Sequence, residues 1–167
     1  MTAKLSKLAV VITVMLAGNA AIAAVGNGTL TATALVLASC NIGAATLAFG
    51  TYDPGSATNL DQATTVPVLC TNGTTYSIYS TTALASRMMV TGAGAAGQDL
   101  VFGVYGSTVD RGAGTQLPLT NTAGKISGTG SGLVQNVNLY GRVAAQQNVF
   151  AGAYTTGATP TNLTIEY

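Results

Sequence analysis

The chain of 167 residues contains no histidine and no tryptophan, and it has only six basic and five acidic residues. Without histidine, Ser-His-Asp and Cys-His catalytic arrangements are excluded. Asp53 and Asp61 are the two carboxylates that a loop could bring together, but both stand among Pro, Gly, Ser and Thr, where aspartate ordinarily caps turns. A glycosidase-like carboxylate pair is therefore not expected. The sequence predicts a protein that is not an enzyme and that uses no cofactor or metal.

The low charge also restricts the partners of the chain. The formal net charge is +1, and it becomes about −1 once the N-terminal segment described below is removed. Neither value favours binding to nucleic acid or to an anionic membrane. A surface with so few charges is typical of a protein that is packed in an assembly, but it also fits β proteins rich in Gly, Thr and Ala.

Cysteine is scarce as well, with Cys40 and Cys70 alone in the chain. An even number of cysteines in an exported protein favours one disulfide. Closing the loop between them would stabilise the fold by roughly 3–4 kcal/mol in the chain-entropy model. The long spacing and the lack of histidine exclude a Cys-x-x-Cys redox pair and a zinc site.

The first 23 residues have the pattern of a secretory signal peptide. Lys4 and Lys7 precede an apolar run over residues 8–17, and Ala21-Ile22-Ala23 has the small residues of a cleavage site. The alternative is a membrane anchor, which needs about 20 apolar residues and would not end in small residues. We therefore expect residues 1–23 to be removed on export.

The mature chain begins with an alternating stretch from Val25 to Val36. Its even positions are small or apolar, and its odd positions 29, 31 and 33 are threonines. This period of two predicts a β-strand with one apolar face. A single strand cannot satisfy its own backbone groups, so this strand needs a sheet, either its own or that of another molecule. The apolar run Leu35-Val36-Leu37 is expected to be buried in a sandwich.

The rest of the chain predicts short strands and no helix, because Thr, Gly, Ser, Asn and Ala dominate. Turns are expected at 53–56, 72–73 and 111–114, an extended edge at 117–119, and a loop at 120–132. About seven strands with turns between them predict an immunoglobulin-like antiparallel β-sandwich. Besides the opening stretch, the expected strands cover residues 47–49, 66–70, 76–80, 87–90, 100–105, 133–140 and 163–167.

Several short runs also occur together in a recognisable order. They are Cys40, Phe49-Gly50-Thr51-Tyr52, Val68-Leu69-Cys70-Thr71, Tyr76-Ser77-Ile78, Arg87-Met88-Met89, residues 100–105, Leu139-Tyr140-Gly141-Arg142, Gly152-Ala153-Tyr154 and residues 163–167. In this order and spacing they resemble the spore coat protein U domain, and the resemblance covers nearly the whole mature chain. The chain departs from the common pattern in lacking a Trp-Gly stretch after Tyr105 and an acidic residue after Tyr154.

The resemblance implies a subunit of an archaic chaperone–usher pilus that supports adhesion and biofilm formation. Such a subunit is an immunoglobulin-like sandwich lacking its last strand. It is exported to the periplasm, where a chaperone lends a strand until an outer-membrane usher adds the subunit to the surface pilus. The N-terminal extension of the neighbouring pilus subunit then replaces the chaperone strand.

Carried over to this chain, residues 24–34 would be the donor strand and residues 35–167 the sandwich domain. Leu30, Ala32 and Ala34 would face the neighbour's core. The three C-terminal residues that would line the acceptor groove and face the chaperone are Leu163, Ile165 and Tyr167. Because the donor side chains are small, we expect main-chain pairing to supply much of the affinity.

Two alternatives stay open at this point. The protein could be a secreted coat protein whose N-terminal strand folds back into its own sheet. It could also be a minor tip or adhesive subunit that binds a surface or a glycan, although a tip adhesin needs an extra binding domain and no donor strand.

Overall fold

The computed structural model describes residues 25–91 and 98–167, so the predicted signal peptide over residues 1–23 lies outside it. The described residues divide into a tail that ends at Leu35 and a domain that starts at Val36. The elements are β1 (Cys40–Ile42), β2 (Leu60–Cys70), β3 (Thr75–Ser80), a 3-10 turn η1 (Leu84–Ser86), β4 (Met88–Thr91), β5 (Leu100–Tyr105), α1 (Thr108–Ala113), β6 (Ile126–Thr129), β7 (Val134–Val143), β8 (Tyr154–Thr155) and β9 (Leu163–Glu166).

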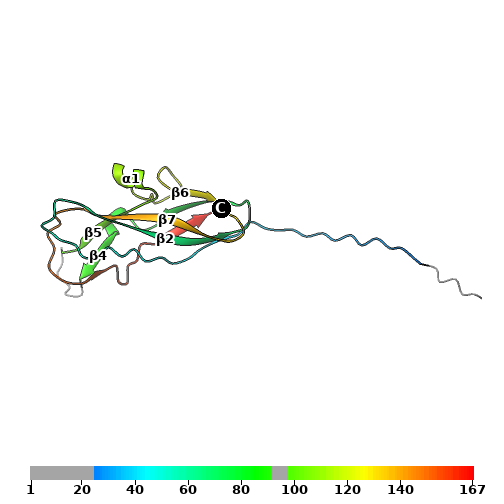
Figure 1. Ribbon diagram of the computed structural model, residues 1–167, viewed down its shortest axis with the longest axis horizontal. Coiled ribbons are helices and arrows are strands. Elements are labelled where there is room, and N and C mark those ends of the chain that lie inside the picture. Colours follow the sequence, from blue (N-terminus) through cyan, green and yellow to red (C-terminus); the bar gives the residue numbers. More distant parts are fainter. Residues whose placement is uncertain (1–24, 92–97) are drawn as a thin grey trace, which may run out of the picture. The chain divides into compact units, whose positions relative to one another are not determined.

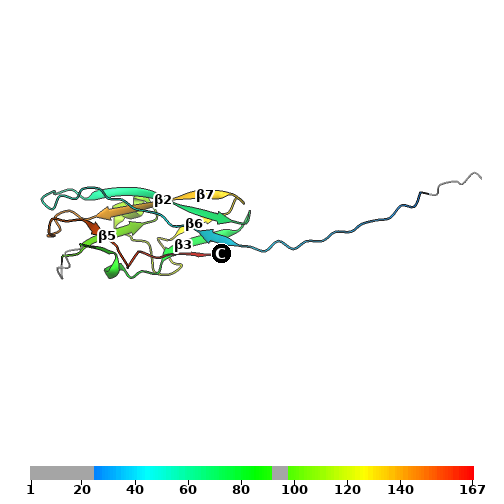
Figure 2. The same ribbon diagram turned by 90° about the horizontal axis from the view of Figure 1, so that it is seen from below.

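The strands form two antiparallel sheets, which confirms the predicted all-β sandwich. The larger sheet has the order β1-β2-β7-β5-β4-β8, and the smaller one has the order β6-β3-β9. β2 and β7 run side by side over ten paired residues (Figure 1). Figure 2 shows β2 and β7 in one layer and β3 in the other. The chain changes sheet between β2 and β3 at Asn72-Gly73, where Gly73 has a φ of 81°.

Alternation along the strands places apolar side chains between the sheets. On β2, Val66, Val68 and Cys70 are buried, as the sequence predicted. One core cluster joins Val68 and Cys70 to Tyr76 and Ile78 of β3. A second, larger cluster lies further along the sandwich and includes Phe49, Val66, Leu100, Phe102, Val104, Leu117, Leu139 and Val143. Burying each such side chain contributes about 1.5–3 kcal/mol to folding.

The predicted disulfide is present. Cys40 on β1 pairs directly with Cys70 on β2, and their Cα atoms lie 4.1 Å apart. The bridge therefore ties the first strand of the domain to the end of the longest one, beside the smaller core cluster.

The prediction of a strand over residues 25–36 is wrong for this structure. These residues form no strand, and the expected burial of Leu35, Val36 and Leu37 is wrong too, because their side chains are 84%, 78% and 71% exposed. The first strand starts only at Cys40. An alternating sequence supplies side chains that suit a sheet, but a strand also needs a neighbouring edge with which to pair.

Three other predictions fail locally. The predicted turn at 111–114 is the end of helix α1, which Ser107 caps by accepting a hydrogen bond from the Asp110 amide at 3.0 Å. Gly114 ends the helix in the left-handed conformation. The loop expected at 120–132 contains strand β6, and the stretch 47–49 forms no strand although Phe49 is buried.

The segment expected to be an extended edge, residues 117–119, instead enters the sandwich with Leu117, while Leu119 remains 43% exposed. Leu117 is fully buried, its amide donates to the Val104 carbonyl at 2.7 Å, and the Pro118 carbonyl accepts from the Ser80 amide at 2.9 Å. The buried Arg87 side chain donates to the Leu117 carbonyl at 2.7 Å. Burial lowers the pKa of this guanidinium from its ordinary value. The segment therefore connects the two sheets through backbone groups.

Candidate functional site

An apolar cleft of about 1000 Å³ opens along one side of the larger core cluster. Its base is formed by core side chains of β5 and β7, among them Leu100, Phe102 and Leu139. One wall is the stretch before β2, residues 45–52 with Pro54, and the other is residues 149–156 with Pro160, Thr161 and Leu163. Both walls are mostly outside regular strands, so the sandwich is less completely closed here than elsewhere.

The first wall is held by a glycine and a tyrosine. A Cβ atom at Gly141 of β7 would collide with Leu47 and Phe49, so the glycine allows this wall to lie against the sheet. The Tyr52 hydroxyl donates to the Ala144 carbonyl at 3.0 Å and accepts from the Gln147 amide at 2.6 Å. These contacts fix the wall to the loop that follows β7.

Strand β9 borders the cleft with a free edge. Among the described residues its only sheet neighbour is β3, with Ile165 opposite Ile78 and Leu163 opposite Ser80. β1 lies close to β9 but belongs to the other sheet. An edge strand with unpaired main-chain groups beside an apolar cleft can receive a further strand.

A buried polar atom lies at the same place. Within the described part of the chain, the Thr161 hydroxyl oxygen is buried and has no hydrogen-bond partner, and Thr161 lines the cleft just before β9. Leaving such a group unpaired costs about 1–3 kcal/mol.

The cleft is also free of charge. Among the described residues that line it, none is acidic or basic. A charged group brought into such a site loses its hydration without gaining a partner, which is strongly unfavourable. The lining therefore suits an uncharged, apolar group better than a charged one.

Asp61, Arg111 and Arg142 form a cluster of charged side chains on the larger sheet, outside this lining. Asp61 accepts two hydrogen bonds from Arg142, at 2.7 and 2.8 Å, and lies 3.4 Å from Arg111. The hydrogen bond from Arg142 is the main cause that lowers the pKa of Asp61, and the same bond raises the pKa of Arg142. This cluster joins β2 to β7 and lies on neither wall of the cleft.

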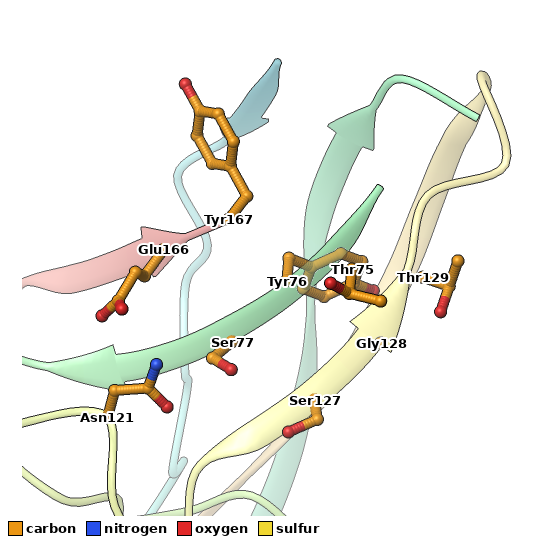
Figure 3. Close-up of a pocket in the computed structure, with 9 residues that line it drawn as sticks. All are labelled: Thr75, Tyr76, Ser77, Asn121, Ser127, Gly128, Thr129, Glu166 and Tyr167. Atoms are coloured by element: carbon orange, nitrogen blue, oxygen red, sulfur yellow. The ribbon is translucent and has the colours of Figure 1, made fainter. Parts of the chain in front are cut away.

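The structure separates the three C-terminal residues that were predicted to line an acceptor groove. Leu163 lines the cleft, and Ile165 packs against the smaller core cluster. Tyr167 is 59% exposed and borders a different, polar groove on the smaller sheet (Figure 3). Contact of any of the three with a chaperone or a donor strand remains a prediction.

The predicted donor residues lie in the tail. Leu30 is 95% exposed, and Ala32 and Ala34 are exposed as well. Because the tail has no strand here, the facing of these side chains also remains a prediction. Sequence reasoning did not identify the second wall of the cleft or Thr161, although the apolar pair Val149-Phe150 was a signal that could have indicated it.

Comparisons with known proteins give one positive result. A search of curated proteins finds no match for this sequence. Within residues 25–91 and 98–167, no helix is long and apolar enough to cross a membrane. The family model of the spore coat protein U (SCPU) domain matches residues 26–161, which is most of the chain. That family consists of structural subunits of extracellular pili and coats. The chain therefore belongs to the spore coat protein U domain family.

Proposed function

We propose that this protein is the structural subunit of a surface pilus, in which the N-terminal segment of one subunit fills the apolar cleft of the next by donor-strand exchange. The observation that carries the proposal is the uncharged cleft beside the free edge of β9. Membership of a pilus and coat subunit family supports it. Pili of this kind would serve adhesion and biofilm formation.

The tail has the composition that this cleft requires. Residues 24–34 contain no charged residue, and their even positions carry small or apolar side chains. With Leu30, Ala32 and Ala34 facing the cleft, Thr29, Thr31 and Thr33 would face solvent. Val36 is also exposed and stands at an even position, so it would add one apolar side chain to the same face. Donor main-chain groups would pair with β9 and supply the affinity that the small side chains do not.

The proposal also defines the partners before assembly. An open apolar cleft in a newly exported subunit promotes aggregation, because both the core and a strand edge are accessible. A periplasmic chaperone that lends a strand would cover it, and an outer-membrane usher would exchange that strand for the tail of the neighbouring subunit. The predicted signal peptide over residues 1–23 fits this route of export.

The first test is a deletion of residues 24–34 in cells that express the chaperone and usher. We expect loss of fibres by electron microscopy, with the subunit still present in the periplasm. Normal fibres from the deleted chain would refute the proposal. Size-exclusion chromatography of the mature protein gives a second readout, because a denaturant-resistant monomer would indicate that the tail fills the cleft of its own chain, as in a self-complemented coat protein.

A further inference from the structure

The outer face of the smaller sheet carries a shallow, open groove of about 520 Å³ whose lining includes hydroxyl, amide and carboxylate groups (Figure 3). The register of the paired strands places the side chains that line the groove in two rows. Ser127 of β6, Ser77 of β3 and Glu166 of β9 lie opposite one another, and Thr129 and Thr75 form the next row. With strands about 4.8 Å apart and rows two residues apart, these side chains spread over about 10 Å by 7 Å. That area is the size of one to two pyranose rings.

A loop and the end of β9 border these rows. The Lys125 ammonium donates to the Asn121 side-chain oxygen, so the Asn121 amide nitrogen keeps its hydrogens for another acceptor. Figure 3 shows this nitrogen on the side of Glu166 and the oxygen turned away. Tyr167 is 59% exposed, and Figure 3 shows its ring on the opposite side of β9 from the Glu166 side chain, turned away from the two rows.

We propose that this groove binds a neutral glycan, a second function that does not depend on strand exchange. The sugar hydroxyls both donate and accept hydrogen bonds, which matches the serine and threonine hydroxyls of the two rows. The Glu166 carboxylate accepts from two neighbouring hydroxyls, and such charge-assisted bonds are the strongest available here.

The charge of the groove selects the class of glycan. Glu166 is the one charged side chain among the described residues that line it, and Lys125, which donates to Asn121, is not part of the lining. A sulfated or uronic acid-containing glycan would bring like charge next to Glu166, so it is disfavoured. If the protein polymerises as proposed above, each subunit presents one such groove, and weak single-site binding becomes strong on a fibre through multivalency.

The test uses the purified mature protein and titration calorimetry with cellotriose, maltotriose, mannotriose and chitotriose, and with chondroitin sulfate as the acidic glycan. We expect binding of at least one neutral trisaccharide and none of chondroitin sulfate. Glu166→Gln should weaken that binding by about tenfold or more, the usual loss for a hydrogen bond to a charged group. Thr129→Val should weaken it by roughly threefold to tenfold while keeping the side-chain shape.

Thr65→Val is the matched control, because Thr65 is exposed on β2 of the other sheet. It should leave the affinity unchanged, and circular dichroism should show all three variants folded. The proposal is overturned if no neutral trisaccharide binds, if chondroitin sulfate binds equally well, or if Thr65→Val weakens binding as much as Thr129→Val. Fibre formation by the same variants is recorded separately, so normal fibres without glycan binding would refute this inference and leave the pilus proposal standing.

Discussion

Residues 25–36 and strand β2 (Leu60–Cys70) are both alternating sequences, but only β2 lies in a sheet. β2 pairs with β1 on one side and with β7 on the other, and its side chains Val66 and Val68 are buried. Residues 25–36 form no strand, and Leu30 and Val36 are exposed. The difference shows that alternation makes a segment able to form a strand, whereas an available edge decides whether it does so.

The comparison predicts that the tail becomes like β2 once it enters a cleft. The largest expected effect, loss of fibres, comes from placing a charge on the face of the tail that would enter the cleft. Ala32→Asp should abolish fibres, because a buried carboxylate has no partner in an uncharged cleft. Thr31→Asp is the matched control on the opposite face and should still give fibres by electron microscopy. Equal effects of the two substitutions would refute the assigned facing.

A smaller effect, a loss of stability, is expected from removing the disulfide at the end of β2. Replacing Cys40 and Cys70 together by serine removes the bond that fixes β1 to β2. We expect the free energy of unfolding in urea to fall by roughly 3–4 kcal/mol. Treating the unaltered protein with reductant should produce the same loss, and an unchanged midpoint in both experiments would show that strand pairing alone holds β1.

The next substitution tests how closely the cleft wall packs against β7. Gly141→Ala places a methyl group against Leu47 and Phe49. Overpacking of this kind costs about 1–3 kcal/mol, which denaturant unfolding will detect. Gly112→Ala in α1 is the control, because a Cβ there meets no neighbour within 4 Å, and it should leave stability unchanged or slightly higher.

The smallest effect concerns the ion pair between β2 and β7. Because Arg142 lowers the pKa of Asp61 in the folded state, this pair stabilises the fold above the unfolded pKa of about 3.9 and loses its effect as pH falls through the lower folded pKa. Asp61→Asn should therefore cost up to about 1 kcal/mol at pH 7, since the pair is partly exposed. The difference should shrink below pH 4. A pH-independent difference would contradict this origin, and Arg142→Gln should remove the same pH dependence.

Much of the fold follows from local pattern. The strands around Val66, Phe102 and Ile165 were predicted because alternation of side chains is a property of a few neighbouring residues. Helix α1 was missed because it is only six residues long and has no apolar periodicity, although Ser107 and Gly114 are ordinary capping residues. The burial of Leu117 could not be predicted, since it depends on contacts with Val104 and Arg87, which are close only in the folded chain.

The features of the candidate sites also divide into those that the sequence determines and those that only the folded chain creates. The disulfide, the uncharged alternating tail and the absence of histidine chemistry are properties of the amino acids and their spacing alone. The cleft beside β9 and the row Ser127–Ser77–Glu166 exist only after folding, because each joins segments that are distant in the chain. Sheet order and register place those segments side by side, and both are set by long-range pairing that no local pattern encodes.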